Sequence, residues 1–202
     1  MMLTRTVGPN TVRVEVLERQ RAQAEALLDK LAELDARGPR LQDGTTIDFG
    51  WSRLTLVDVD GILDVEEPEF RGDPFESRMP GAFETIGVAQ DQVDVLRRVG
   101  VEGVDARFDS AVIVRRGCLS APRIYLKRDE PEGRSSGWYI GDVAHPEVEK
   151  EDLEVITVAD VFKQRSEAMR VLALPPGYMA VLDSSVIEAV VDPEGKVVAR
   201  DF

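Results

Sequence analysis

The first regular pattern of apolar positions along the chain predicts a long helix over residues 11–36. Apolar side chains recur there at three- and four-residue spacing with charges between them, which is the period of one helix face. Asn10 or Thr11 is placed to cap the start, and Gly38 and Pro39 follow the end. Such a seam usually packs into a core, and a homodimer through this N-terminal helix is the alternative. The seam consists of Leu17, Ala24, Leu27, Leu28, Leu31 and Leu34.

Short apolar runs bounded by turn residues predict hairpins in both halves of the chain. Residues 54–59 and 62–65 form two short strands around Asp60-Gly61, a common hairpin pair. Residues 186–200 contain two valine-rich runs around the turn Asp192-Pro193-Glu194-Gly195. Both patterns predict antiparallel pairs of strands.

A third hairpin is predicted between these two, with residues 111–116 paired to residues 123–127. Helices are predicted over residues 88–99 and 156–170, and the second of them begins near Thr157. Together the elements predict an α+β fold, with a long N-terminal helix, antiparallel strands and hairpins, and packed helices. A boundary near residues 100–108 divides the chain into an N-terminal α+β region, 1–107, and a C-terminal α+β domain, 108–202.

The composition is that of a soluble globular protein. The chain has 202 residues, of which 43% are hydrophobic and 31% are charged, which is enough apolar material for a core. Its apolar runs fall well short of the ~20 residues that span a bilayer, and the N-terminus lacks the apolar segment of a secretory signal. The single cysteine, Cys118, forms no internal disulfide. A reducing cytoplasm is therefore the expected compartment.

The formal net charge of −13 disfavours nucleic acid and anionic membrane as partners, because binding either relies on Lys and Arg at phosphate groups. Acid excess keeps many proteins soluble, and the alternative is a negative face that attracts a basic protein partner. Acids gather in residues 54–70 and 147–160, and bases gather in residues 107–128. Even where the basic segment pairs with one acidic segment inside the fold, we expect at least one acidic face to stay exposed.

Residues for catalysis or metal binding are scarce in the sequence. The single histidine, His145, and Cys118 make one conceivable thiol pair. Cys118 lies in a predicted turn, however, where a small buried residue is the favoured interpretation. One cysteine and one histidine leave a zinc site short of ligands, and Asp58, Asp60 and Asp64 do not match the spacing of a calcium loop. The sequence predicts a protein that is not an enzyme and uses no cofactor or metal.

The segment 117–142, GCLSAPRIYLKRDEPEGRSSGWYIGD, resembles the signature of a bacterial family of immunity-protein-like domains, first catalogued as a domain of unknown function. The matching features are a cysteine that closes a strand, a charged turn ending in proline, an S-G-W triplet followed by an aromatic residue, and then G-D. They correspond to Cys118, residues 128–131, Ser136-Gly137-Trp138, Tyr139 and Gly141-Asp142. The resemblance covers residues 108–202 and implies a role in neutralising a toxin.

The residues themselves favour binding over catalysis in this segment. In an extended chain Trp138 and Tyr139 point to opposite faces, so we expect Trp138 to be buried and Tyr139 to reach the surface. The first hypothesis is a non-catalytic inhibitor of a bacterial toxin, a basic cognate partner. The alternative is a regulatory or scaffold domain that binds its own oligomer or a small ligand. The predicted partner-binding residues are Asp58, Asp60, Asp64, Glu66, Glu67, Glu69, Tyr139, Asp142, Glu147 and Glu149.

Overall fold

The computed structural model describes every residue except residue 148. The chain divides into two compact units, Met1–Ala89 and Gln90–Phe202, which are called unit 1 and unit 2 below. The boundary between them falls inside helix α2 (Phe83–Val99). The division into independent domains at residue 107 stays a prediction.

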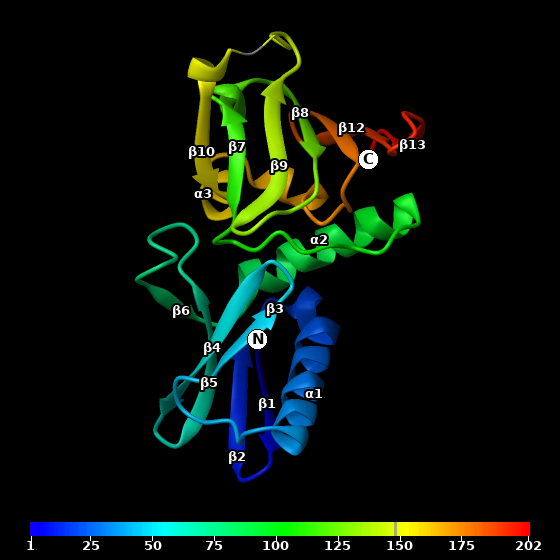
Figure 1. The fold of residues 1–202 in the computed structure, drawn as a ribbon. Helices are drawn as coiled ribbons and strands as arrows, with labels where there is room; N and C mark the ends of the chain where they lie inside the picture. The colour runs from blue at the N-terminus through cyan, green and yellow to red at the C-terminus, as the bar shows by residue number, and fades with distance from the viewer. Residues whose placement is uncertain (148) are drawn as a thin grey trace. The chain divides into compact units, whose positions relative to one another are not determined.

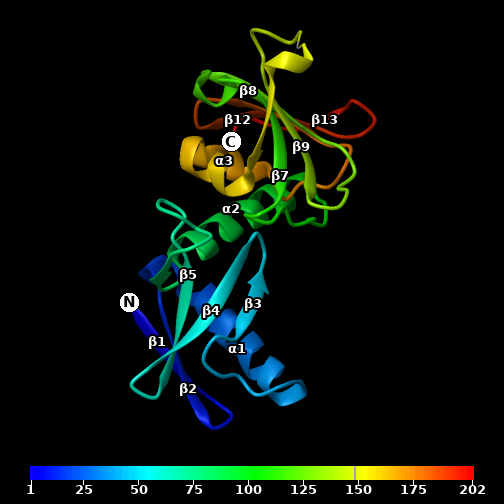
Figure 2. The same cartoon turned by 60° about the vertical axis from the view of Figure 1, so that its left-hand side comes forward.

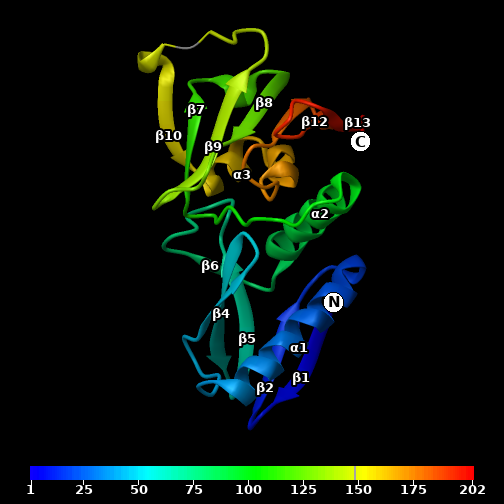
Figure 3. The same ribbon diagram turned by 45° about the vertical axis from the view of Figure 1, so that its right-hand side comes forward.

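Unit 1 is a mixed sheet with one long helix packed against it (Figures 1 and 3). The strand order is β1-β2-β5-β4-β3, with β6 paired to β5, and β2 and β5 run parallel. Helix α1 (Arg21–Arg37) follows a short 3-10 turn, η1 (Glu18–Gln20). The strands are β1 (Met2–Val7), β2 (Asn10–Glu15), β3 (Thr46–Phe49), β4 (Ser52–Val59), β5 (Ile62–Pro68) and β6 (Arg78–Pro80).

The apolar seam of α1 forms the core of unit 1. Ala24, Leu27, Leu28 and Leu31 are buried with the inward valines of β1 and β2, so the core-packing interpretation is confirmed for these four residues. Leu17 and Leu34 of the predicted seam are exposed. A homodimer through this helix stays a prediction. The β4–β5 hairpin around Asp60-Gly61 is also confirmed, with the two strands paired antiparallel.

Unit 2 is a seven-stranded mixed sheet in the order β10-β7-β9-β8-β11-β12-β13. Figures 1 and 2 show α3 on one side of the strands β7 and β9. The helical segments are α3 (Val158–Gln164) and the 3-10 turns η2 (Cys118–Ser120), η3 (Lys150–Asp152) and η4 (Ser166–Val171). The strands are β7 (Ala111–Arg115), β8 (Arg123–Arg128), β9 (Ser135–Asp142), β10 (Leu153–Thr157), β11 (Met179–Asp183), β12 (Val186–Val191) and β13 (Val197–Arg200).

The predicted α+β fold class, with a long N-terminal helix and packed helices, is wrong. The described residues form thirteen strands in two mixed sheets, and the chain starts with two strands rather than a helix. Residues 11–16, TVRVEV, alternate polar and β-branched side chains, which is the period of a strand. Val12, Val14 and Val16 accordingly face the core. The helix begins only at Arg21.

The hairpin predicted between residues 111–116 and 123–127 is also wrong. Strand β9 lies between them, parallel to β7 and antiparallel to β8. The central position suits β9 because its inward side chains, Trp138 and Ile140, are buried between those of both neighbouring strands. Strand β7 instead pairs at its other edge with β10.

The other predicted elements of unit 2 are confirmed, with shifted ends. Thr157 caps α3 through a reciprocal pair of hydrogen bonds with Asp160, but α3 ends at Gln164 and a 3-10 turn continues the chain. Helix α2 ends at Val99 as expected and begins at Phe83, before its predicted start. Strands β12 and β13 form the C-terminal hairpin.

Candidate functional site

The signature segment forms the core of unit 2 through Trp138. As expected, this side chain is buried, with 1% of its surface exposed. Its indole Nε1 donates a hydrogen bond of 2.9 Å to the Leu172 carbonyl oxygen, which satisfies the one polar atom of the ring. The segment that carries most of the family resemblance is therefore structural on its inward face.

Arg128, in the charged turn of the same signature, is a buried cation that sequence reasoning missed. It is fully buried, and its guanidinium donates to the carbonyl oxygens of Leu174 and Val104 at 2.6 Å and of Ser136 at 3.1 Å. Burial lowers its pKa to about 10. The sequence did indicate its burial, because side chains alternate along a strand and Arg128 lies on the same face as Ile124 and Leu126.

Cys118 and His145, the conceivable catalytic pair, each have another partner. The Cys118 thiol is buried and donates to the Ile140 carbonyl oxygen at 3.4 Å, and burial raises its pKa to about 11. His145 Nδ1 lies 2.7 Å from Asp142 Oδ2. A thiol with a raised pKa is a poor nucleophile, so Cys118 acts as a small buried residue, as expected.

The outer face of the unit 2 sheet carries a row of mostly apolar side chains at the surface. Each strand contributes one residue, aligned by the register of the ladder. Val155 is 69% exposed and Ile113 is 40% exposed. Exposed neighbouring apolar side chains are typical of a binding surface. This apolar row runs Val155, Ile113, Tyr139, Lys127, Met179, Val191 and Val197.

Two tyrosines form the centre of this outer face. Tyr139 is half-buried on the face opposite Trp138, as the extended segment predicts. Its ring centroid lies 5.8 Å from that of Tyr125, and the rings are tilted by 50°. The Tyr125 ring lies over Gly141, where a Cβ atom would come within 2.5 Å of it. Gly141 thus makes room for Tyr125, and burial raises the pKa of Tyr139.

One edge of the sheet, at β10, is a second candidate surface for a partner. The Arg116 N–H bonds to the Asp152 carbonyl oxygen and the Val158 N–H bonds to that of Ser110. Because hydrogen-bonded pairs alternate in an antiparallel ladder, these two bonds fix which residues of β10 face β7. The residues between them at positions 153, 155 and 157 turn their N–H and C=O groups to the edge.

The N–H groups at both ends of this edge are already bonded within the chain. The Leu153 N–H donates to the Lys150 carbonyl oxygen, and the Thr157 N–H donates to Asp160 Oδ2 at 2.9 Å. Adding a strand of a partner requires a run of free backbone groups. Two of the N–H groups at this edge are therefore not free to pair with another strand, and the Val155 side chain is exposed on the outer face.

The predicted contact residues of unit 2 lie around the connection from β9 to β10. Glu147 and Glu149 are exposed there, as is Glu151. Asp142 is buried at the end of β9, where hydrogen bonds from His145 and the Ala144 N–H lower the pKa of its carboxyl group. Asp142 therefore shapes the connection, whereas the glutamates give it a negative surface.

The basic segment of unit 2 pairs in part with nearby acids. Arg116 forms an ion pair of 3.5 Å with Glu154 of β10, and Arg123 pairs with Glu188 of β12. The Arg116–Glu154 pair fits the expectation that the basic segment pairs with an acidic one, whereas Glu188 lies outside both acidic segments. The exposed glutamates of the β9–β10 connection lie outside these two ion pairs.

The predicted contact residues of unit 1 occupy different environments. Asp58 and Asp60 are exposed at the β4–β5 turn, Glu69 is exposed after β5, and Glu66 is half-buried. Asp64 forms a two-pronged ion pair with Arg13, with both oxygens 2.5 Å from guanidinium nitrogens. This carboxylate is therefore engaged within the sheet.

Glu67 is buried and serves the fold. Its two carboxylate oxygens accept hydrogen bonds from the Glu84 and Thr85 N–H groups in the first turn of α2, where backbone N–H groups lack helical partners. Burial raises the pKa of Glu67, and these hydrogen bonds oppose the shift in part. The strand alternation of β5 placed Glu67 inward, between Val65 and the loop.

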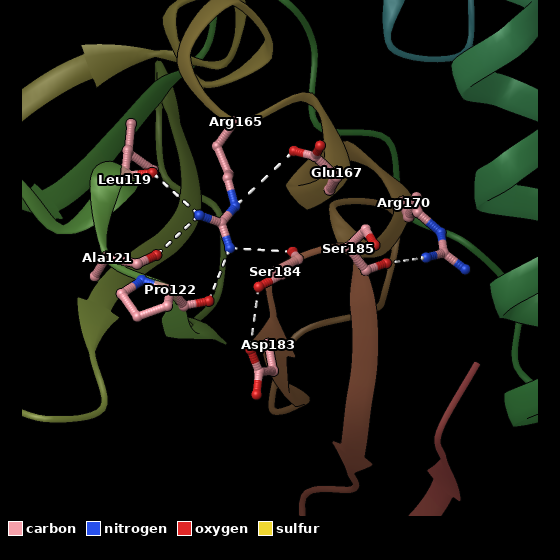
Figure 4. Close-up of polar contacts among 9 residues, drawn as sticks. All are labelled: Leu119, Ala121, Pro122, Arg165, Glu167, Arg170, Asp183, Ser184 and Ser185. Atoms are coloured by element: carbon pink, nitrogen blue, oxygen red, sulfur yellow. Dashed lines mark hydrogen bonds and ion pairs between the residues drawn. The ribbon is translucent and has the colours of Figure 1, made fainter.

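Arg165 links two connections of unit 2 through its guanidinium group (Figure 4). Its guanidinium donates to the carbonyl oxygens of Ala121 at 2.8 Å, Pro122 at 3.0 Å and Ser184 at 3.0 Å. These acceptors belong to the β7–β8 connection and the β11–β12 turn. A polar hollow of about 470 Å³ lies beside this arginine. Its Nη1 and Nη2 atoms already donate to backbone oxygens, and Nε lies 3.9 Å from Glu167 Oε2.

Two kinds of feature, metal-holding groups of side chains and membrane-spanning helices, are absent from the described residues. No group of three or more His, Cys, Asp or Glu side chains there is arranged to hold a metal ion. None of the helices in the same residues has the length and apolarity to cross a membrane.

Unit 2 belongs to the class of domains built on a single sheet, with helices on one face and a partly apolar outer face. The family model of the Imm33-like domain matches residues 91–193, which lie within unit 2. The chain belongs to this immunity-protein family, and the resemblance inferred from the signature segment is confirmed. No curated protein and no solved structure matches the chain.

Proposed function

We propose that this protein is a non-catalytic inhibitor that binds a bacterial toxin in the cytoplasm and blocks it by covering part of its surface. Membership of an immunity-protein family supports the role, and such families are generally non-enzymatic. The observation that carries the proposal is the apolar row on the sheet of the unit that the family model matches, in which Val155 and Ile113 are exposed.

The toxin docks on the outer face of the unit 2 sheet. Val155 and Ile113 are paired across β10 and β7 and are exposed side by side, and Tyr139 lies next to Ile113 on β9. Aromatic and aliphatic side chains at the centre of a patch commonly supply most of the binding energy. The exposed glutamates of the β9–β10 connection lie beside this face and complement a basic toxin.

Val155→Lys and Ile113→Lys are each expected to weaken toxin binding by about tenfold or more. Each removes an apolar contact that becomes buried in the complex, and each adds a positive charge that repels a basic toxin. The measurement is the dissociation constant for a toxin encoded beside the gene for this protein. Rescue of cells that express this toxin should fall in parallel.

Val93→Lys is the matched control for these substitutions. Val93 is also 40% exposed, but it lies in helix α2, away from the sheet. It should retain full binding, with a melting temperature close to the wild type. Equal binding by all three variants would rule out the outer face as the docking surface, and failure of the wild-type protein to inhibit any such toxin would overturn the function itself.

Charge reversal of Glu147, Glu149 and Glu151 to lysine is expected to slow association with a basic toxin. Long-range attraction raises association rates, and salt screens it over ~8–10 Å at ordinary ionic strength. The wild-type on-rate should therefore fall with added salt, and the reversed variant should show a weaker dependence. Stopped-flow kinetics at two salt concentrations provides the measurement.

Asp58 and Asp60 supply the control for charge reversal. Both are exposed in unit 1, so their reversal changes the net charge by a comparable amount without touching the proposed surface. Their variant should associate at nearly the wild-type rate. A larger effect from these two aspartates would move the contact to unit 1, and an on-rate indifferent to salt would exclude electrostatic attraction.

A further inference from the structure

A hollow of about 610 Å³ in unit 2 combines a basic wall with an aromatic one. It lies between the C-terminal part of α2 and the end of the chain. Its apolar part is the Phe202 ring together with Val95, and its charged part is mainly arginine. The lining residues are Asp94, Val95, Arg97, Arg98, Arg170 and Phe202.

Two arginines flank the same aromatic ring. The guanidinium carbon of Arg98 lies 4.5 Å from the centroid of the Phe202 ring, and that of Arg170 lies 6.0 Å from it. Phe202 is itself held in place, because its backbone exchanges hydrogen bonds with Ile187 at 2.9 and 3.2 Å. The ring thus orients two cations before any ligand arrives.

Much of the donor capacity of these arginines is unused. Arg170 Nη1 donates to the Ser185 carbonyl oxygen at 2.9 Å, and Figure 4 shows its other terminal nitrogen turned away from Ser185. Asp94 lies 3.8 Å from Arg97. Among the ion pairs of the described residues, neither Arg98 nor Arg170 has a carboxylate partner.

This concentration of positive charge stands out in a chain of net charge −13. Two guanidinium groups beside one ring add their positive potentials at the hollow. Each presents a planar fork of N–H donors that fits the oxygens of a carboxylate or a phosphate. We propose that the hollow is an oxyanion-binding site, formed by Arg98 and Arg170 with Phe202 as its apolar floor, and separate from the outer face of the sheet.

The oxyanion is either a phosphate or a carboxylate, and the test separates these two chemistries. Inorganic phosphate and acetate are titrated into the full chain at constant ionic strength, while the arginine Nε–H signals are followed by NMR. Saturable shifts of the Arg98 and Arg170 signals are expected for at least one ion. Arg98→Gln and Arg170→Gln should each weaken that binding by about tenfold, because each removes a charge-assisted pair of hydrogen bonds.

Arg97→Gln is the matched control, because Arg97 lines the same hollow but lies beside Asp94. It should bind the ion nearly as well as the wild type, and Arg98→Lys should bind less well because it keeps the charge but loses the fork. Binding of phosphate without acetate indicates a phosphate group, and the reverse indicates a carboxylate. Absence of saturable shifts with both ions, or equal affinity in Arg97→Gln and Arg170→Gln, would overturn the site without affecting the proposed toxin binding.

Discussion

Replacing Trp138 by alanine is expected to lower the free energy of unfolding by about 3–5 kcal/mol. The side chain is among the largest that are fully buried in this protein. The substitution leaves a cavity, removes the hydrogen bond from Nε1 to the Leu172 carbonyl oxygen, and takes away the ring over which the Arg128 guanidinium lies at 5.5 Å. Chemical denaturation followed by circular dichroism measures the loss.

The neighbouring residue provides the control for this prediction. Tyr139 lies on the opposite face of β9 and is only half-buried, so Tyr139→Ala should cost clearly less stability while weakening toxin binding. An unchanged melting temperature for Trp138→Ala would be incompatible with its position in the core. Loss of stability in one variant and of binding in the other would separate the two faces of the signature segment.

Replacing Arg128 by methionine is expected to cost about 3 kcal/mol or more. Methionine fills the space of the stem, but the carbonyl oxygens of Val104, Ser136 and Leu174 then lose their donor. Each buried polar group left without a partner costs about 1–3 kcal/mol. The unfolding free energy from urea titration is the measurement, and Arg128→Lys should recover part of the loss because it restores one donor group.

Lys127 is the matched control for Arg128, one position earlier on the same strand. Its side chain is exposed on the outer face and lies 3.4 Å from Asp129. Lys127→Met should change stability by no more than about 0.5 kcal/mol, as is usual for surface substitutions. Equal effects of the two methionine substitutions would show that the buried hydrogen bonds of Arg128 contribute little.

Local patterns in the sequence predicted those features that depend on neighbouring residues. The Asp60-Gly61 turn, the valine-rich hairpin at the C-terminus and the Thr157 cap all formed where expected. The alternation of Trp138 and Tyr139 was sufficient to place one inward and the other outward. Such features require only the period of the strand or the chemistry of a turn.

The two errors have different causes, and the first arose where two local patterns competed. In residues 11–36 a strand period in TVRVEV runs directly into a helix period, and Leu17 was assigned to the helical seam although it precedes α1. The pairing of 111–116 with 123–127 failed for a different reason. Strand neighbours depend on which side chains fill the shared core, and β9 enters between β7 and β8 from farther along the chain.

The sequence by itself determined the acidic character of this protein, the hairpins at Asp60-Gly61 and at the C-terminus, and the signature that identifies its family. Only the tertiary structure decided which charges remain at the surface and which serve the fold. In the sequence, Glu67 belongs to an acidic run and Arg128 to a basic run, which is typical of surface residues. In the structure both side chains are buried and form hydrogen bonds with backbone groups. The physical reason is that a charged side chain is buried only where donors or acceptors from distant segments converge on it, and that convergence depends on the assembled sheets.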